Sequence, residues 1–270
     1  MTETKQMHRI TGNTRLLFML ADPVANIRGN ALLTDFFQSK GADAAMIPLH
    51  VHPESLRTVL VGLRSIGNVA GIGITLPHKI AVVPLLDQLT DRARDVGAVN
   101  FVKRDAQGRL WGDNIDGLGF VAGLQASGVE PFGMEVLQVG AGGAGRAIAF
   151  ALAAAGVSHL HIVNRSGDKA AALAAAVQDA HPGCRCDSGD AEPRSYGLVV
   201  NTTSLGMRPG DALPLSPELL SPRSTFAEVI MTPAITPMMA AAQARGCRVV
   251  EGKAMLVGQM EAAARFAGLW

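Results

Sequence analysis

The sequence predicts an α/β protein built from two domains, and three observations support that prediction. Strand-like and helix-like segments alternate along both halves of the 270-residue chain. The composition is 48% hydrophobic but only 4% aromatic, and it is rich in Ala and Gly, which suits helices packed closely on parallel sheets. A glycine-rich turn between an apolar strand and an apolar helix restarts the alternation near residue 135.

The first half is expected to form a sheet covered by helices. Its predicted strands are 16–20, 44–49 and 71–75, and its predicted helices are 30–40, 53–66 and 79–86. A hairpin with strands 100–104 and 110–112 follows, and residues 114–119 lead into another helix. Because a parallel pair of strands needs a long crossover, this alternation favours parallel pairing.

The second half is expected to form a Rossmann domain, a doubly wound parallel sheet. Its predicted strands are 136–139, 159–163, 198–201, 226–230 and 248–250, and its predicted helices are 146–155, 168–180 and 237–245. A last helix, 253–266, is expected to pack back across the first domain. We therefore expect a substrate-binding and catalytic domain over residues 1–118, completed by a C-terminal segment 247–270. A nucleotide-binding domain is expected over 119–246.

Charge and cysteine content exclude several classes of protein. The net charge is +1 and the basic residues are spread along the chain, so neither nucleic acid nor a membrane surface is an expected partner. The apolar stretch 147–157 is too short to span a bilayer. Three cysteines, Cys184, Cys186 and Cys247, argue against a disulfide framework and favour a reducing, cytoplasmic location. The expected state is a monomer or a homodimer.

The strongest local motif is Gly-x-Gly-x-x-Gly at Gly140, Gly142 and Gly145. The first glycine permits a tight turn, the second lets the backbone approach a pyrophosphate, and the third lets the helix pack on the strand. Gly143 and Ala144 complete the turn, where the helix N-terminus offers N–H groups to phosphates. A glycine turn without a ligand is the alternative, but the strand–turn–helix context favours a nucleotide.

The end of the next strand indicates which dinucleotide is bound. A carboxylate there would favour NAD, whereas this chain has Asn164, Arg165 and Ser166, with Lys169 close behind. Arginine can pair with a 2′-phosphate through its planar fork, so we expect NADP, with NAD as the alternative cofactor. The competing interpretation is a solvated helix start, in which Asp168 partly offsets the basic charge.

Lys79 and Asp116 are candidates for moving a proton. Lys79 follows a strand end, and Asp116 stands in a polar turn before the nucleotide domain. Oxidising an alcohol requires a group that takes the hydroxyl proton, and in the reverse direction a lysine ammonium can donate it. Taken alone, each residue is better explained as structural, Lys79 as a solvated side chain and Asp116 as a helix N-cap.

Several motifs together resemble the shikimate/quinate dehydrogenase family, from about residue 17 to the C-terminus. The matching segments, in order, are GIGITLPHK at 71–79, GAVN at 97–100, DNIDGLGF at 113–120, GAGGAG at 140–145, NRS at 164–166, NTTSLGM at 201–207 and GKAMLVGQ at 252–259. The resemblance implies a catalytic domain and a Rossmann domain, with substrate and nicotinamide meeting between them.

The resemblance also implies roles for individual residues. Lys79 and Asp116 become the catalytic pair. It implies that Thr75, Asn100 and Gln259 form hydrogen bonds with the ring hydroxyls of the substrate. It also implies that the cofactor is contacted by Asn201, Thr202, Met207 and Met255.

The chain departs from the family at the end of the pocket that holds the substrate carboxylate. Ile27 and Gly29 stand where the family has a Ser-x-Ser pair, and Ile230 stands where it has Tyr. Phe101 and Ile115 each replace a usual Thr. Each lost hydrogen bond to the charged carboxylate would weaken substrate binding by roughly 1.5–3 kcal/mol.

One guanidinium can hold a carboxylate in bidentate fashion, so Arg28 is a candidate to compensate for the missing hydroxyls. We expect an NADP-dependent oxidoreductase acting on a secondary hydroxyl or ketone of a small, shikimate-like cyclic polyol that is itself a carboxylate. The alternatives are a genuine shikimate or quinate dehydrogenase and, from another class, a catalytically silent NADP-binding sensor. No metal is expected, because no further cysteine or carboxylate cluster lies near His50 and His52 in sequence.

Overall fold

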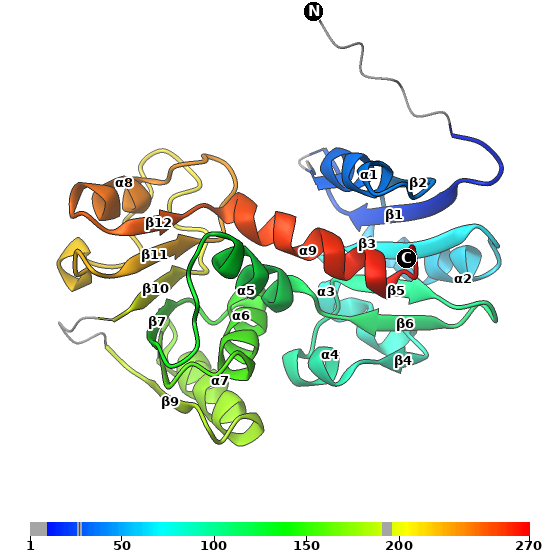
Figure 1. Cartoon of the computed structure of the whole chain (residues 1–270). Helices are drawn as coiled ribbons and strands as arrows, with labels where there is room; N and C mark the ends of the chain where they lie inside the picture. The colour runs from blue at the N-terminus through cyan, green and yellow to red at the C-terminus, as the bar shows by residue number, and fades with distance from the viewer. Residues whose placement is uncertain (1–9, 26, 28, 191–195) are drawn as a thin grey trace, which may run out of the picture. The chain divides into compact units, whose positions relative to one another are not determined.

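The computed structural model describes residues 10–25, 27, 29–190 and 196–270, and the chain divides into two compact units. Unit 1 comprises Met1–Asn114 with Ala263–Trp270, and unit 2 comprises Ile115–Ala262. By this division only the last eight residues of the expected C-terminal segment 247–270 group with the first unit. The functional boundaries at 118/119 and 246/247 stay predictions. Figure 1 shows the elements of each unit.

Unit 1 is built on a six-stranded mixed sheet. The strand order is β2-β1-β3-β5-β6-β4, with bounds β1 Arg15–Ala21, β2 Ala44–His50, β3 Val69–Ile74, β4 Gln88–Leu89, β5 Phe101–Arg104 and β6 Leu110–Asp113. β1 pairs in parallel with both β2 and β3, as the alternation predicts, while β5 pairs antiparallel with β3 and β6. The predicted hairpin thus extends the parallel part of the sheet.

The helices of unit 1 are α1 (Gly29–Ser39), α2 (Leu56–Arg64), α3 (His78–Ala81) and α4 (Asp91–Val96), with 3-10 turns at Pro53–Ser55 and Val83–Leu85. α3 is shorter than the expected helix 79–86, because Pro84 has no backbone N–H and disfavours helical geometry before it. The core of the unit consists of aliphatic side chains from the sheet and α2, including Leu20, Leu60, Ile72 and Ile74.

Unit 2 is built on a six-stranded parallel sheet with the doubly wound order expected from the sequence. The order is β12-β11-β10-β7-β8-β9, with bounds β7 Glu135–Val139, β8 His159–Val163, β9 Arg185–Ser188, β10 Leu198–Asn201, β11 Thr225–Glu228 and β12 Arg248–Val250. α6 (Gly143–Ala154) and α7 (Gly167–Ala180) pack on β8, and α8 (Pro237–Ala244) packs on β11 and β12. β7 and β10 are adjacent at the point where the strand order reverses.

The helix α5 (Asp116–Ala126) approaches its neighbours so closely that only glycine fits at the contacts. A Cβ atom on Gly117 would lie 2.3 Å from the carbonyl oxygen of Ala147 in α6. On the other side, a Cβ on Gly258 of α9 (Gly252–Phe266) would lie 2.1 Å from the carbonyl oxygen of Gly119. These contacts form a glycine seam, Gly117, Gly119, Gly123 and Gly258, which brings the helix backbones together.

Replacing Gly258 by alanine is expected to destabilise unit 2. The added Cβ must displace backbone rather than a flexible side chain, which we expect to cost about 1–3 kcal/mol. The matched control is Gly62→Ala in α2, where nothing lies within 4 Å of the new Cβ. That change should stabilise the protein by roughly 0.5–1 kcal/mol through helix propensity. Urea unfolding followed by circular dichroism measures both, and equal effects would contradict the seam.

Candidate active site

The glycine turn after β7 is packed on one side and open on the other. Gly140 has a φ of +110°, and a Cβ there would lie 2.5 Å from Oγ1 of Thr202. A Cβ on Gly145 would lie 2.5 Å from the carbonyl oxygen of Gly140. At Gly142 and Gly143, by contrast, a Cβ would meet nothing within 4 Å. Gly140 and Gly145 therefore allow the tight packing, and the middle of the turn remains accessible to a ligand.

Two buried side chains support the turn from the sheet. The amide Nε2 of Gln138 donates to the carbonyl oxygens of Gly140 and Gly145, both at 2.9 Å. Thr202, which follows β10, directs its hydroxyl at the carbonyl oxygens of Val139 (2.8 Å) and Gly140 (3.1 Å). The contribution of Gln138 was missed in the sequence, although a polar residue inside an apolar strand was a usable signal.

The residues present fit a dinucleotide. α6 begins directly after the turn. Its N-cap residue, Gly142, has no side chain to cap the first N–H groups of the helix, and the space beside Gly142 and Gly143 is open. N–H groups at such a terminus bind pyrophosphate oxygens well, since the helix dipole adds partial positive charge. Gly140 to Gly145, with Ala144, thus form the cradle in which the two phosphates would lie.

The segment after β8 is tied to this cradle. Oδ1 of Asn164 accepts a hydrogen bond from the backbone N–H of Ala141 at 3.2 Å, and its Nδ2 donates to the carbonyl oxygen of Ser166 at 3.0 Å. Arg165, Ser166 and Lys169 are solvent-exposed at the start of α7. The basic side chains predicted to read a 2′-phosphate therefore lie beside the turn and are accessible.

Asn201 lies at the end of β10, but its side chain holds the protein's own loop. Its Nδ2 donates to Oε2 of Glu228 (3.0 Å) and to the carbonyl oxygen of Leu205 (3.2 Å), while its Oδ1 accepts from the N–H of Thr203 (3.0 Å). Met207 in this loop is 53% exposed, and Met255 is half-buried on α9. The structure thus gives Asn201 a supporting position and leaves Met207 accessible.

Glu228 is a buried carboxylate that the motif search did not single out. Its oxygens accept hydrogen bonds from Asn201, from the N–H groups of Val229 (2.8 Å) and Ile230 (3.1 Å), and from the hydroxyl of Thr236 (3.2 Å). Burial raises the pKa of Glu228, and these four donors oppose that shift by favouring the charged form. The carboxylate connects the loop after β10 to the loop after β11.

Thr75, Lys79 and Asn100 come together at the carboxyl end of β3 in unit 1. The N–H of Ile74 donates to the carbonyl oxygen of Asn100 at 2.8 Å, and the N–H of Val99 donates to that of Lys79 at 2.8 Å. Thr75 and Lys79 are half-buried, and Asn100 is buried. Backbone hydrogen bonds therefore hold three predicted substrate-site residues on one edge of the sheet, where ligands of parallel sheets bind.

Asp116 and Gln259 come together in unit 2. Nε2 of Gln259 in α9 donates to Oδ1 of Asp116 at 3.0 Å, across the glycine seam. Asp116 is buried and stands in the first turn of α5, whose N-cap residue is Ile115. The helix N-terminus favours a carboxylate there. The alternative interpretation of Asp116 as the N-cap is therefore wrong.

For the other predicted site residues the structure gives fewer contacts or none. Arg28 and Asn26 lie outside the described residues. Lys79 and Asp116 belong to different units, each of which is described by itself. Among the residues that depart from the family, Ile115, Ile230 and Phe101 are buried. Phe101 makes an edge contact with Phe266, at 6.3 Å between ring centroids.

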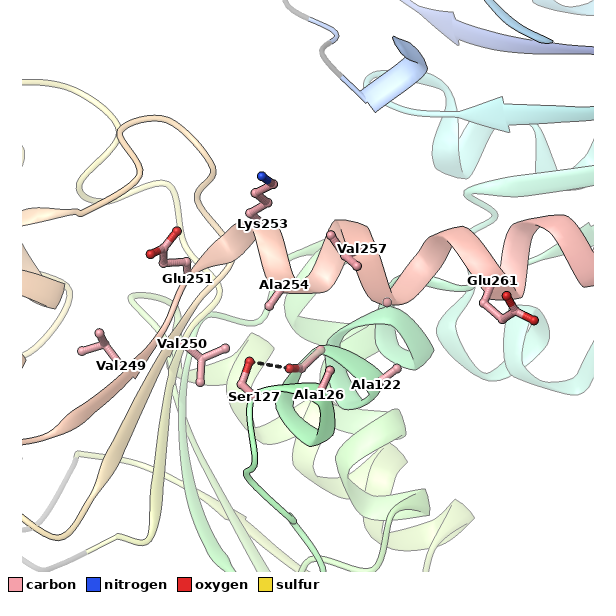
Figure 2. Close-up of a pocket in the computed structure, with 12 residues that line it drawn as sticks. Ala122, Ala126, Ser127, Val249, Val250, Glu251, Lys253, Ala254, Val257 and Glu261 are labelled. Carbon is pink, nitrogen blue, oxygen red and sulfur yellow. Dashed lines mark hydrogen bonds between the residues drawn. The ribbon is translucent and has the colours of Figure 1, made fainter. Parts of the chain in front are cut away.

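A separate groove of about 580 Å³ lies elsewhere in unit 2 and contains none of the predicted site residues (Figure 2). It lies between the end of α5 and the start of α9, and the hydroxyl of Ser127 donates to the carbonyl oxygen of Gly123 at 2.8 Å beside it. Its walls are mainly small and aliphatic residues such as Ala122, Ala126 and Val257.

Among the described residues, no helix combines the length and apolarity that crossing a membrane requires.

A glycine turn at the switch point of a doubly wound sheet is typical of dinucleotide-binding oxidoreductases, and a lysine just after a strand is a residue type that can move a proton. Comparison with known proteins extends this. Residues 19–102 match the shikimate dehydrogenase substrate binding domain, and residues 127–188 match shikimate / quinate 5-dehydrogenase. A shikimate dehydrogenase (NADP(+)) of Geobacter metallireducens is 37% identical, over 94% of this chain and 91% of that protein.

Solved structures agree. The 5-ketofructose reductase of Gluconobacter sp. strain CHM43, in its ligand-free form, superimposes with a TM-score of 0.85 at 31% identity, covering 95% of this chain and 97% of that one. The shikimate 5-dehydrogenase of Thermus thermophilus, in complex with NADP(H) and shikimate, gives 0.83 at 32% identity, covering 93% and 92%. The chain belongs to the shikimate/quinate dehydrogenase family, and it is an alcohol-type dehydrogenase that favours NADP.

Arg165→Ala is expected to weaken NADP binding selectively. Losing a charge-assisted contact of about 1.5–3 kcal/mol should raise the Michaelis constant for NADP roughly 10- to 100-fold, while that for NAD changes little. The control is Arg223→Ala, which removes an exposed arginine of unit 2 in the turn before β11. Steady-state kinetics with both cofactors measure the ratio, and equal rises for NADP and NAD would contradict the assignment.

Proposed function

We propose that this protein interconverts a secondary hydroxyl and a ketone on a small cyclic polyol that carries no carboxylate at the end remote from the reacting carbon. NADP is the redox partner, Lys79 and Asp116 handle the proton, and the reaction takes place in the cytoplasm. The observation that carries the proposal is the loss of hydroxyl groups from positions where the family grips a carboxylate.

The residues at those positions offer no replacement donors from their side chains. Ile230 is buried, with 4% of its surface exposed, so this position presents methyl groups instead of a phenol. Gly29 is buried at the start of α1 and has no side chain, and Ile27 is half-buried. A carboxylate facing such groups would lose its hydration without gaining hydrogen bonds, which is unfavourable. An uncharged hydroxylated carbon chain does not incur that penalty.

The likeness to a 5-ketofructose reductase supports this choice. The substrate in that protein's name is a ketone with several hydroxyl groups and no carboxylate. The likeness extends over nearly all of both chains. The fold therefore accommodates a family member whose substrate lacks the charged group of shikimate.

The proposed chemistry divides between cofactor and protein. A bound reduced nicotinamide would supply the hydride. Lys79, as an ammonium, would donate the proton to the ketone oxygen, and Asp116 would stabilise that ammonium or accept its proton in the oxidative direction. Gln259 already orients the carboxylate of Asp116 at 3.0 Å. Thr75 and Asn100, fixed beside Lys79, would bind substrate hydroxyls.

Shikimate itself is the second candidate substrate. Relatives named shikimate dehydrogenase (NADP(+)) from Geobacter metallireducens and Rhodospirillum rubrum are 37% and 38% identical to this chain. Arg28 would then have to hold the carboxylate in place of the missing hydroxyls.

A substrate panel separates the two candidates. NADPH oxidation at 340 nm is followed with 5-ketofructose and 3-dehydroshikimate, and NADP reduction is followed with fructose, shikimate, quinate and uncharged cyclic polyols. We expect catalytic efficiency on an uncharged polyol or its ketone to exceed that on shikimate by at least roughly tenfold, given the cost of each unmade hydrogen bond. Faster turnover of shikimate would overturn the proposal. Retained NADP binding without turnover of any compound would favour a sensor.

Lys79→Met is expected to lower turnover by about 10²–10⁴-fold, because it removes the proton donor while keeping an unbranched side chain. NADPH binding, followed by nicotinamide fluorescence, should remain within a factor of about two, since the glycine turn is untouched. Lys40→Met, an exposed lysine at the end of α1, serves as the control and should behave as the parent protein. Near-normal turnover of the Lys79 variant would remove this residue from the mechanism.

A further inference from the structure

Three side chains with metal-binding atoms meet at the carboxyl end of β1 and β2 in unit 1. Oδ1 of Asp22 lies 2.8 Å from Nε2 of His50, and its Oδ2 lies 3.2 Å from Nδ1 of His52. The two imidazole rings are 4.8 Å apart between centroids, and one ligand atom from each residue lies within 4.8 Å of the others. We name this group the Asp22 cluster.

The separations suit a transition-metal ion. Zinc binds histidine nitrogen at about 2.0–2.1 Å and carboxylate oxygen at about 2.0–2.2 Å, so two ligand atoms in a tetrahedral site lie roughly 3.3 Å apart. The Asp22 pairs, at 2.8 and 3.2 Å, are close to that spacing. Both histidine side chains are largely exposed, 45% and 60%, so small rotations can complete the geometry without disturbing the core. Two histidines and one carboxylate leave a fourth position for water or a small ligand.

We propose that Asp22, His50 and His52 form a binding site for a divalent transition-metal ion of the zinc class on the substrate-binding unit. The carboxylate that reaches His50 and His52 is that of Asp22, which directly follows β1 and lies 28 residues before His50 in sequence. The parallel pairing of β1 with β2 aligns Ala21 with His50, which brings Asp22 to the histidines.

Charge also favours this cluster over the second group of similar composition. The second group, His159, His161 and Asp187, has buried histidines, and Arg185 contacts Oδ2 of Asp187 at 3.0 Å. A cation entering there would have to displace a guanidinium, whereas the ion pairs of Asp22 among the described residues are with the two histidines.

The Asp22 cluster is bonded to the segment that carries Lys79. The N–H of Asp22 donates to the carbonyl oxygen of Leu76 at 3.2 Å. Nε2 of His78, the residue before Lys79, donates at 2.8 Å to the carbonyl oxygen of Val51, which lies between the two histidines in sequence. An ion that fixes Asp22, His50 and His52 would therefore also make the segment that carries Lys79 more rigid.

Metal binding by untagged full-length protein tests the proposal directly. Protein treated with a chelator and dialysed is titrated with Zn²⁺ by calorimetry, and with Co²⁺ by visible absorption, which reports tetrahedral ligation. We expect one ion per chain. His50→Ala and His52→Ala should each weaken its binding at least tenfold, because each removes one of three ligands, and both histidines are exposed enough for the fold to be retained. The matched variant Asp187→Asn should leave binding unchanged.

Every other outcome would overturn the proposal. Loss of the ion in Asp187→Asn with retention in both histidine variants would place it at the second group. A strong near-ultraviolet sulfur-to-cobalt band would place it at Cys184 and Cys186, whose sulfur atoms lie 3.6 Å apart. Failure of Zn²⁺ to saturate the protein at millimolar concentration would exclude a site. None of these readouts depends on turnover, so they stand apart from the substrate proposal.

Discussion

The close approach of α5 to α6 and α9 is the constraint on which the rest of unit 2 depends. At this seam backbone meets backbone, because no side chain separates Gly117 from Ala147 or Gly258 from Gly119. The approach sets the position of the first turn of α5, and with it Asp116. It also brings Gln259 within hydrogen-bonding distance of that carboxylate. A proposed catalytic group is thus positioned by packing between helices and oriented by one amide.

The nucleotide cradle follows from a second constraint, the adjacency of β7 and β10. Their pairing places Thr202 directly beneath the turn that follows β7, where its hydroxyl and the amide of Gln138 bind the inward-facing carbonyl oxygens. Buried carbonyl groups are satisfied in this way, while the face at Gly142 and Gly143 stays open. The same strand ends carry Asn201 and Glu228, which organise the following loops.

How much could be predicted from the sequence differs between local and non-local features. Strands 159–163, 198–201 and 248–250 coincide with β8, β10 and β12. For β10, the reason is that a buried parallel strand is a short apolar run with clear borders. The helix α4 was missed because it is short and polar, although Thr90 caps its start and Gly97, with φ +69°, ends it. β9 was not predicted, since an edge strand of four residues carries little apolar pattern.

Contacts between distant segments were beyond sequence reasoning. The glycine motif and the family motifs named residues, but their partners depend on strand register and helix packing. Asp22 beside His50 and His52 is one case, and Glu228 beneath Asn201 is another. Gln259 was named as a substrate ligand, whereas its hydrogen bond to Asp116 required the seam.

The two hydrogen bonds from Gln138 have a consequence for how the protein divides affinity from selectivity. Because the sheet already holds the turn, no binding free energy is lost in ordering this loop when a dinucleotide binds. That preorganisation acts on the pyrophosphate, a group that NAD and NADP share. It would strengthen both equally, and their discrimination would depend on the exposed basic residues after β8, to which we assign the 2′-phosphate. Evolution can therefore exchange one cofactor for the other at the surface without rebuilding the interior.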